Sequence, residues 1–442
     1  INGLTTKKAS GYGIKRHMTT ASYPATKRHD SNSRQNKNGK KTSIGIIGAG
    51  LAGCATAYSL AKRGFKVEIF DSDSKIANHA SGIPFLAVRP RLFQTESPIA
   101  QYFLHSFLFS SAQFTHLSKN TDIGWKETSV MQLNHALNKR KPMDITKISS
   151  IYSDDILRPF NTEQSTALAG VRLSKAGIIF PHGGMIKPND LCNFYINSPT
   201  INVNLNVPIT EIRYSNNQWN LYSGKPNPLT KVDKLILANS PRLRHLIQTK
   251  YLPLTKSSGT VTWFSATTSS RPLKSIVCGK RTVFPLHKAE SEKHLVAASY
   301  NNEIDILSPS KATQENYEGA IQNFDFAEVL ANSNRGNKSG MRCSTPDRIP
   351  YIGKLPKYEA IRKKLAYLQN NARKSLHLAD DCYWPELYIN AAHGSNGAAT
   401  CPFSAEILAS MINEEPLPID KQILASINPS RIVIRDLKKQ KG

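Results

Sequence analysis

The sequence predicts an α/β fold that opens with a dinucleotide-binding β-α-β unit, and three observations predict it. A short apolar segment at 43–47 is followed directly by a glycine-rich turn of pattern G-x-G-x-x-G at 48–53. A helical pattern then runs to Arg63, and Gly64 stands where a helix is expected to end. A second apolar segment, 65–70, closes the unit and leads into Asp71. Because a lone G-x-G-x-x-G is a weak signal, this complete context is what favours a nucleotide site over a β-α-β unit without a ligand.

The glycine-rich turn gives each of its residues a mechanical role. Gly48 allows the tight turn, Gly50 lets the backbone approach a pyrophosphate, and Gly53 lets helix and strand pack closely. The free N–H groups and positive dipole at the start of the helix favour phosphate. Asp71 is expected to accept the ribose hydroxyls, and Asp73 is a second candidate for that role. The expected nucleotide contacts of this unit are Gly48, Gly50, Leu51, Ala52, Gly53 and Asp71.

The length and composition place limits on the class of protein. A chain of 442 residues suits two or three interlocked domains, and 39% hydrophobic residues suffice for a core. No run approaches ~18 apolar residues, so we expect no membrane span and no secretory signal. The six cysteines form no C-x-x-C pair and lie at no metal-ligand spacing to histidine. We therefore expect reduced thiols, a cytoplasmic location and no metal site.

The charge balance points to a polyanionic partner. The net charge is +26, and residues 1–41 carry ten Lys or Arg and one Asp, which leaves +17 on the rest of the chain. Nucleic acid is the first candidate for such a surface. Charge alone does not separate a nucleic-acid partner from a general role in solubility.

Three later segments resemble the D-amino-acid oxidase and glycine oxidase superfamily of flavoenzymes. Ala238-Asn239 and Gly394-Ser395-Asn396-Gly397 fall where that family places flavin-facing segments, and 341–353 resembles its substrate side. The resemblance implies FAD as the cofactor and a Rossmann-like FAD-binding domain interleaved with a mixed-sheet substrate domain. It also implies that Arg342 holds a substrate carboxylate, which the guanidinium fork matches bidentately. Arg348, in the same segment, is more simply explained as a structural arginine.

A closer resemblance covers about 42–440. The segments that carry it are 80–82, 181–185, 278–279, 298–300, 344–347, 393–406, 415–418, 428–431 and 438–439. They resemble the oxidoreductase half of the bifunctional tRNA 5-methylaminomethyl-2-thiouridine biosynthesis family. The resemblance adds Ser81 and Gly82 to the flavin site. Two positions depart from the family pattern: Ile83 replaces an asparagine and Asn396 replaces an arginine, which puts catalytic vigour in doubt more than flavin binding.

The resemblance also implies a domain organisation. Residues 1–21 are similar to the last strands of that family's methyltransferase half, and the chain begins with Ile1, so we expect a fragment whose S-adenosylmethionine-dependent domain is missing. Residues 22–41 have the composition of a basic flexible linker. The FAD-binding domain is expected to comprise 42–90, 165–245 and 341–442. The substrate domain is expected to comprise 91–164 and 246–340.

The function implied by the resemblance is oxidation of a modified tRNA base. The family's substrate is a wobble uridine bearing a carboxymethylaminomethyl group, which is chemically an N-substituted glycine. Oxidation at its methylene and hydrolysis of the imine release glyoxylate and leave the aminomethyl uridine. The expected partner is the tRNA anticodon arm, bound by a monomer of this chain. Candidate phosphate contacts are Arg89, Arg91, Lys139, Arg140 and Lys141.

Two other functions are compatible with the same residues. An oxidase of free glycine, sarcosine or a D-amino acid shares the glycines and Arg342 but has no need of the basic surface. A non-catalytic RNA-binding flavoprotein fits the departures at Ile83 and Asn396.

Overall fold

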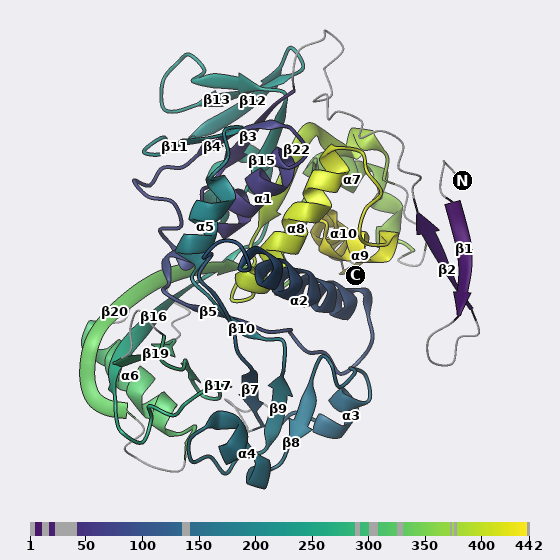
Figure 1. Cartoon of the computed structure of the whole chain (residues 1–442). Coiled ribbons are helices and arrows are strands. Elements are labelled where there is room, and N and C mark those ends of the chain that lie inside the picture. Colours follow the sequence, from purple (N-terminus) through teal and green to yellow (C-terminus); the bar gives the residue numbers. More distant parts are fainter. Residues whose placement is uncertain are drawn as a thin grey trace.

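A six-stranded sheet forms the upper half of the molecule in Figure 1. The computed structural model describes residues 5–10, 17–22, 42–134, 142–287, 292–299, 308–324, 330–371, 374 and 378–439. The strands run parallel except for the last pair, which is antiparallel. In spatial order they are β11 (Ile201–Asn204), β4 (Lys66–Phe70), β3 (Ser43–Ile47), β15 (Lys234–Leu237), β22 (Tyr383–Ala391) and β21 (Tyr351–Pro356).

The sheet is buried on both faces, as parallel sheets require. In β3, Ile44 and Ile46 belong to the core on one face, whereas Ile47 belongs to the core on the other. The first face is covered by α1 (Leu51–Ala61), α5 (Pro188–Ile196) and α8 (Gly397–Ile412). The second is covered by the small sheet of β12 (Glu211–Ser215), β13 (Gln218–Tyr222) and β14 (Thr230–Val232) and by two 3-10 segments, η2 (Ser240–His245) and η3 (Ile247–Thr249).

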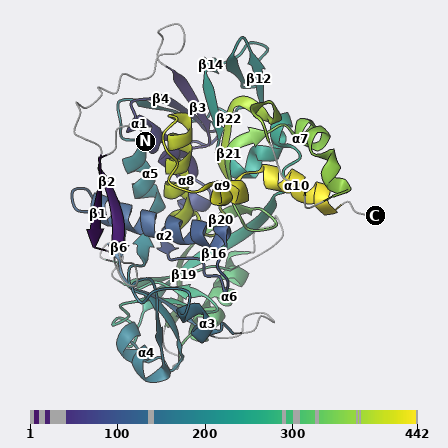
Figure 2. The ribbon, with the colours of Figure 1, turned by 90° about the vertical axis from the view of Figure 1, so that its right-hand side faces the viewer.

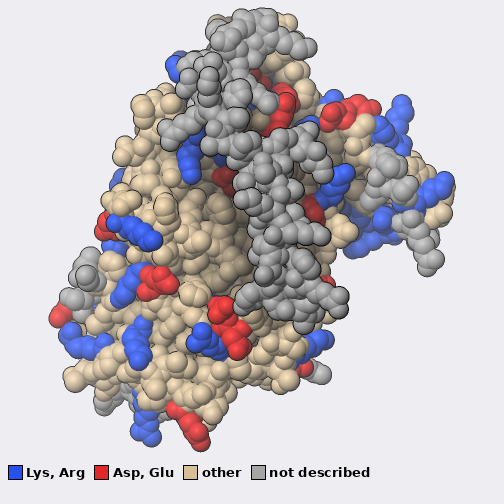
Figure 3. Space-filling view, turned by 45° about the vertical axis from the view of Figure 1, so that its right-hand side comes forward, with Lys and Arg blue, Asp and Glu red and all other residues tan. Residues whose placement is uncertain are grey.

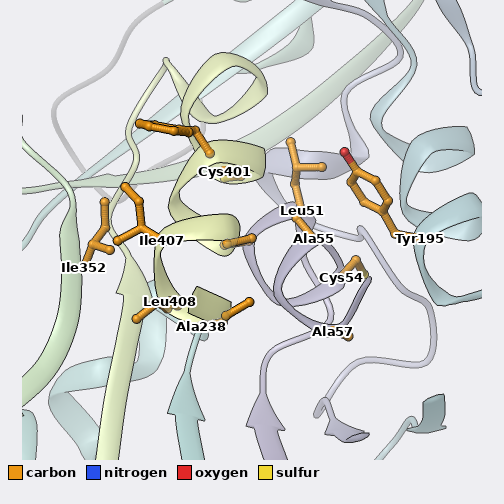
Figure 4. Packing of buried hydrophobic residues seen from close by; sticks show 14 of the residues in the cluster. Leu51, Cys54, Ala55, Ala57, Tyr195, Ala238, Ile352, Cys401, Ile407 and Leu408 are labelled. Carbon is orange, nitrogen blue, oxygen red and sulfur yellow. The ribbon is translucent and has the colours of Figure 1, made fainter. Parts of the chain in front are cut away.

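Small residues bring α1 and α8 close together. Ala55 and Ala57 of α1 are buried, and Figure 4 shows this helix beside α8, which contributes Ile407 and Leu408 to the same cluster. Short side chains reduce the distance between packed helices, and the apolar contacts that result stabilise the pair. Helix α1 follows β3 and α8 follows β22; because both strands run parallel to β15, the two helices begin at the same end of the sheet.

An eight-stranded, mixed sheet forms the lower half of the molecule (Figure 1). Its two longest strands, β16 (Thr255–Ala266) and β20 (Leu330–Ser344), pair antiparallel and extend up to the first sheet. The others, in order after β16, are β19 (Lys293–Ala297), β18 (Thr282–Val283), β17 (Ile276–Cys278), β7 (Val130–Leu133), β9 (Gly177–Phe180) and β8 (Arg158–Phe160). Around this sheet lie α3 (Ile145–Ser149), α4 (Thr162–Ala169) and α6 (Pro309–Ile321).

The long helix α2 (Pro98–Leu117) lies between the two halves, as Figures 1 and 2 both show. Near it are η1 (Ala80–Gly82) and a three-stranded sheet of β5 (Leu86–Val88), β10 (Gly184–Ile186) and β6 (Trp125–Glu127). The C-terminal part of the chain forms a projecting lobe (Figure 2). It contains α7 (Tyr358–Lys364), η5 (Ala366–Gln369), η6 (Asp380–Cys382) and α10 (Ser430–Lys439). Helix α9 (Lys421–Ile427) instead packs in the core of the first sheet. At the N-terminus, β1 (Thr5–Ser10) pairs antiparallel with β2 (His17–Ser22).

The structure confirms the predicted β-α-β unit, and Gly64 adopts the left-handed conformation, at φ 83°, that ends its helix. Strand β11 ends at Asn204, because Asn206 has φ 57° and turns the chain. Helix α8 begins at Gly397 and accommodates Pro402 in its first two turns. The linker predicted at 22–41 lies outside the described residues except for its first position.

Two further sequence expectations concern membranes and metals. Within the described ranges, no helix has the length and hydropathy needed to cross a bilayer. The same ranges contain no group of three or more His, Cys, Asp or Glu placed to hold a metal ion. All six cysteines are free thiols with buried side chains.

Candidate active site

A cavity opens at the carboxyl ends of β3, β4 and β15, the place where α/β sheets bind their ligands. It brings together segments that lie up to about 350 residues apart in the chain. The predicted residues that line it are Gly48, Gly50, Leu51, Ala52, Asp71, Ser81, Ala238, Asn239, Arg342, Gly394, Ser395 and Gly397. Gly53, Gly82 and Asn396 do not line it. Sequence reasoning missed several other lining residues, among them His79, Ser240, Arg242, Met341, Cys343, His393 and Cys401.

The glycine-rich turn is built as its spacing predicted. Gly48 has φ 113°, and a Cβ there would lie 2.8 Å from the carbonyl of Ala238. A Cβ on Gly53 would lie only 1.9 Å from the carbonyl oxygen of Gly48, so this glycine acts through packing although it does not line the cavity. Gly50 is different, because a Cβ there would meet only the hydroxyl of Ser81, at 3.5 Å. Gly50 therefore keeps the cavity clear, whereas Gly53 holds the turn together.

Two helix N-termini meet at this cavity. At the start of α1, Gly50 occupies the N-cap position without a side-chain cap, and the Leu51 amide donates to Ser81 Oγ at 3.0 Å. At the start of α8, Asn396 occupies the N-cap position, again without a side-chain cap, and Gly397 lines the cavity. The positive ends of the two helix dipoles favour an anionic or electron-rich ligand here.

The two candidate acids form one wall of the cavity. Asp71 accepts hydrogen bonds from the Ala49 amide at 2.6 Å and from the Asp73 amide at 2.9 Å, which fixes its carboxylate beside the turn. Asp73 pairs with His79 at 2.8 Å and lies 3.8 Å from Arg242. The network fixes Asp71 at the cavity wall and makes Asp73 a link between two basic side chains.

The loop after β22 is held against the end of β20. Ala392 has φ 65° and Gly394 φ 59°, and the Gly394 amide donates to the Cys343 carbonyl at 2.9 Å. The ring of His393 lies between Thr400 Oγ1, at 2.8 Å, and Asn390 Oδ1, at 2.9 Å. Burial lowers the pKa of His393 to about 3, so the imidazole is neutral near pH 7. The loop consequently adds no positive charge to the cavity.

Asn239 brings a buried acceptor to the wall of the cavity. Its Oδ1 atom is buried and has no hydrogen-bond partner in the described structure. A buried acceptor that is left unpaired costs about 1–3 kcal/mol, and such a cost is usually offset by a bound group. A hydrogen-bond donor on a ligand in this cavity would satisfy it.

Arg342 and Arg348 lie in different environments. Arg342, on β20, lines the cavity, and its guanidinium lies over Gly259 of β16, 3.5 Å from the place where a Cβ would stand. Arg348 has φ 58° and an exposed side chain, and its carbonyl oxygen accepts from Arg91 at 2.7 Å. Of these two arginines, Arg342 lines the cavity and Arg348 does not.

The two departures from the family pattern also have clear positions. Ile83 is buried, and its Cδ1 atom would lie 3.0 Å from a Cβ on Gly340, so it packs against the β20 strand beside Arg342. Asn396 caps α8 through its backbone only. Neither Ile83 nor Asn396 is among the residues that line the cavity.

The C-terminal motif 428–431 has a structural role beside the site. Arg431 donates to both carboxylate oxygens of Asp347, at 3.1 and 3.2 Å, and to the Ile349 carbonyl at 2.5 Å. Burial by itself raises the pKa of Asp347, but the hydrogen bonds and charge of Arg431, with help from Thr345, hold it below its usual value. This pair anchors the segment that follows Arg342 on β20.

The candidate phosphate contacts are not equivalent. Arg91 lies with its guanidinium carbon 5.1 Å from the ring centre of Phe93 and 4.9 Å from that of Phe103, and it also binds Arg348, so it holds two parts of the fold together. Arg89 donates to the neighbouring Pro90 carbonyl at 3.4 Å. Lys139, Arg140 and Lys141 lie outside the described residues.

Comparison with known proteins decides the family. The model of the protein family DAO, described as FAD dependent oxidoreductase, matches residues 43–411 of this chain. The chain belongs to this FAD-dependent oxidoreductase family. Solved structures share the fold: glycine oxidase from Geobacillus kaustophilus has a TM-score of 0.66 and 19% identity, over 88% of this chain and 98% of that one. Iminodiacetate oxidase from Chelativorans has a TM-score of 0.67 and 15% identity, over 87% and 98%.

Curated relatives of this oxidoreductase carry one name. The tRNA 5-methylaminomethyl-2-thiouridine biosynthesis bifunctional protein MnmC of Pseudomonas fluorescens Pf-5 is 30% identical over 408 residues, which is 90% of this chain and 60% of the relative. Its namesake from Pseudomonas aeruginosa PAO1 is 29% identical over 446 residues, 98% of this chain and 66% of the relative. The chain thus spans about two thirds or less of the relatives it matches.

The cavity fits the cofactor that the family implies. The glycine-rich turn and the N-terminus of α1 suit a pyrophosphate, and Asp71 suits a ribose. Asn239, with its unpaired acceptor, and the 394–397 loop lie on the part of the wall that also carries Arg342. The same cavity therefore holds the nucleotide-type turn and the guanidinium of Arg342.

Proposed function

We propose that this oxidoreductase uses FAD to remove the carboxymethyl group from 5-carboxymethylaminomethyl-(2-thio)uridine at the tRNA wobble position, which leaves the 5-aminomethyl form. The observation that carries the proposal is that Arg342, a side chain suited to bind a carboxylate, lines the same cavity as the glycine-rich turn. The carboxymethylamino group is an N-substituted glycine, and its carboxylate matches the guanidinium fork. The name of the curated relatives supports tRNA as the carrier of that group.

The side chains of this site would bind and orient the substrate. Arg342 would fix the carboxylate, so that the methylene between nitrogen and carboxylate faces the flavin; such positioning supplies several kcal/mol of a barrier. FAD, when bound, accepts two electrons and a proton from that methylene as a hydride. The substrate becomes an imine, and water cleaves it into glyoxylate and the primary amine.

Burial in the cavity favours the reactive form of the amine. The substrate nitrogen must lose its proton before the methylene can give up a hydride. Removal from water disfavours the charged ammonium relative to the neutral amine. We name no side-chain base, because desolvation of the amine acts in the required direction.

The remaining parts of the proposal concern the longer protein. Since the relatives extend beyond this chain, we infer that an S-adenosylmethionine-dependent methyltransferase domain belongs to the full-length protein and converts the aminomethyl product to methylaminomethyl-2-thiouridine. The β1–β2 hairpin would then be the end of that domain, and residues 42–90, 165–245 and 341–442 would form the FAD-binding domain. We propose a cytoplasmic monomer that binds the tRNA anticodon arm.

The proposal is tested with tRNA that carries carboxymethylaminomethyl uridine. The FAD-loaded chain is incubated with it, and the nucleosides are then measured by mass spectrometry. We expect loss of the carboxymethyl group and release of one glyoxylate per nucleoside converted. Rapid oxidation of free glycine or sarcosine with no change in the tRNA would favour the amino-acid oxidase instead, and bound FAD with no turnover of either would favour a non-catalytic flavoprotein.

A further inference from the structure

A second groove lies on the C-terminal side of the molecule, outside the flavin cavity. It has a volume of about 620 Å³ and is formed by η3, the start of α7 and the beginning of β22. Its lining residues are Ile247, Gln248, Lys250, Tyr251, Lys357, Tyr358, Glu359, Ala360 and Trp384. A volume of this size lies within the range of small-ligand sites, and a nucleobase fits it.

Three aromatic rings and two lysines make this groove unusual. Tyr251 and Tyr358 pack with ring centres 5.0 Å apart, and Lys357 Nζ lies 5.6 Å from the ring centre of Trp384. All three rings are only half-buried, so part of each remains open to a ligand. Beside them Ile247 is 78% exposed, a high value for a large apolar side chain. Aromatic faces flanked by cations are the pattern that binds the bases and backbone of single-stranded nucleic acid.

One of the residues that line the groove, Gln248, carries a buried acceptor without a partner in the described structure. Gln248 is 8% exposed, and its Nε2 donates to the Ile212 carbonyl at 2.9 Å, which fixes the orientation of the amide. Its Oε1 atom has no hydrogen-bond partner in the described structure. Glu359 adds a second acceptor to the lining. Exocyclic amines of cytosine, adenine or guanine would donate to such acceptors, whereas uracil has no exocyclic amine.

A basic segment joins the groove to the flavin cavity. Asn239, Ser240 and Arg242 line the cavity, and the same chain continues through η2 and η3 to Ile247 and Gln248 in the groove. Between them Arg242, Arg244 and His245 are exposed. With ~2.0 Å of rise per residue in a 3-10 helix, the segment from 239 to 248 spans at most about 18 Å. About five stacked nucleotides, at ~3.4 Å each, cover that distance.

The surface around the groove carries further positive charge. Figure 3 shows Lys and Arg side chains over the projecting lobe that contains α7 and α10. Some of these charges are already paired, because Lys364 binds Asp381 at 3.0 Å and Lys354 binds Asp380 at 2.8 Å. Lys250 and Lys357, in the groove itself, line its rim, where only Glu359 carries the opposite charge. The net positive charge of the groove favours a polyanion over a basic peptide as its occupant.

We propose that this groove holds an unpaired nucleotide of the tRNA whose modified uridine enters the flavin cavity, with the base stacked on Tyr358 and the phosphates along the 242–245 segment. The inference rests on the proposed function for the identity of the RNA. It adds a second contact that selects a structured RNA over a free amino acid. The groove therefore contributes to KM for tRNA and leaves the oxidation of a small N-substituted glycine unaffected.

The test compares Tyr358→Leu, which keeps apolar volume but removes the stacking face, with Tyr222→Leu. Tyr222 is a matched control, because both rings lie beside an arginine: Arg362 Cζ is 5.5 Å from the ring centre of Tyr358, and Arg213 Cζ is 4.6 Å from that of Tyr222, which is outside the groove. We expect Tyr358→Leu to raise Kd for tRNA by about 5- to 100-fold, the loss of one base stack. Lys357→Gln should act in the same direction, and Lys119→Gln, on an exposed site after α2, should not.

Two readouts separate this inference from the proposed function. Turnover of the free carboxymethylaminomethyl nucleoside should be equal in all variants, and oligocytidylate should bind the wild-type chain more tightly than oligouridylate of the same length. If the wild type converts tRNA but Tyr358→Leu matches Tyr222→Leu in Kd and KM, the groove is not on the RNA path and another protein segment is its occupant. If the wild type does not convert tRNA, the proposed function itself fails.

Discussion

Gly50→Ala offers a sharp test of the nucleotide cradle, because the structure separates its effect on the ligand from its effect on the fold. At Gly50 the backbone has φ −81° and a Cβ would meet only Ser81 Oγ, at 3.5 Å. Alanine fits this conformation and gains about 0.4–1 kcal/mol from a more restricted unfolded chain, while its poorer N-cap preference offsets a similar amount. The free energy of unfolding of the FAD-free protein should therefore change by less than about 1 kcal/mol.

Binding of FAD should respond much more strongly to the same change. The added methyl group occupies the side of the turn that faces the cavity, where a pyrophosphate approaches the backbone. Loss or lengthening of two hydrogen bonds to a charged phosphate, at about 1.5–3 kcal/mol each, weakens FAD binding by at least about 100-fold. Kd is measured by flavin fluorescence on FAD-free protein, and stability is measured by denaturant unfolding of the same samples.

Gly53→Ala is the matched comparison. Its Cβ would stand 1.9 Å from the Gly48 carbonyl oxygen, so the turn itself must move and the free energy of unfolding should fall by several kcal/mol. The reasoning would be refuted by a Gly50→Ala protein that binds FAD as tightly as the wild type, or by one that is destabilised as much as Gly53→Ala.

The other predictions concern the supports of the site. Arg431→Met leaves the half-buried Asp347 carboxylate without its main partner and should destabilise the chain by about 2 kcal/mol in denaturant unfolding at pH 7; Lys438→Met, at the end of the same helix, should not. Because the pKa of Asp347 is lowered in the folded state, its contribution to the free energy of unfolding is present above its unfolded pKa and is lost as the pH falls through the folded pKa. The difference in unfolding free energy between the wild type and Arg431→Met should therefore shrink in acid. A constant difference down to pH 3 would contradict this. The folded pKa of His393, about 3, is below its unfolded value of about 6.5, so its contribution to the free energy of unfolding is fully present above pH 6.5 and declines toward pH 3. From pH 7 to 5 the wild type should lose about 1–2 kcal/mol of unfolding free energy in denaturant unfolding. His393→Gln, which can still bond Thr400 and Asn390, should show a smaller loss.

The sequence predicts the nucleotide end of the site better than the substrate end. Gly48 and Gly53 are identifiable because their roles depend on local backbone geometry, which a short motif specifies. Arg342 could be assigned only through the family resemblance, because the residues adjacent to it in sequence do not indicate that β20 extends from one sheet to the edge of the other. The spacing of Asp71 likewise located the ribose end of the cavity, while the part that Asp73 plays with His79 and Arg242 depends on tertiary contacts.

The C-terminal motif and the second groove show why the rest was not predictable. The 428–431 run was recognisable as a family feature, but its work is done through Arg431 on Asp347, a residue 84 positions away in sequence. The groove joins Tyr251 to Tyr358 and Trp384, which follow it by more than 100 residues, and the three positions show no common periodicity. Contacts of this kind follow from the packing of the lobe against the first sheet, and a single sequence does not specify that packing.

The most direct test of the central claim is single-turnover conversion of tRNA carrying carboxymethylaminomethyl uridine by the FAD-loaded chain and by Arg342→Lys. The lysine keeps the charge but loses the bidentate fork that orients the carboxylate. The account predicts that the wild type converts the nucleoside to the aminomethyl form with one glyoxylate released, and that Arg342→Lys binds FAD normally but reacts at least about tenfold more slowly, a loss of about 1.4 kcal/mol in positioning. An unchanged nucleoside with the wild type, or equal rates for both proteins, would contradict it.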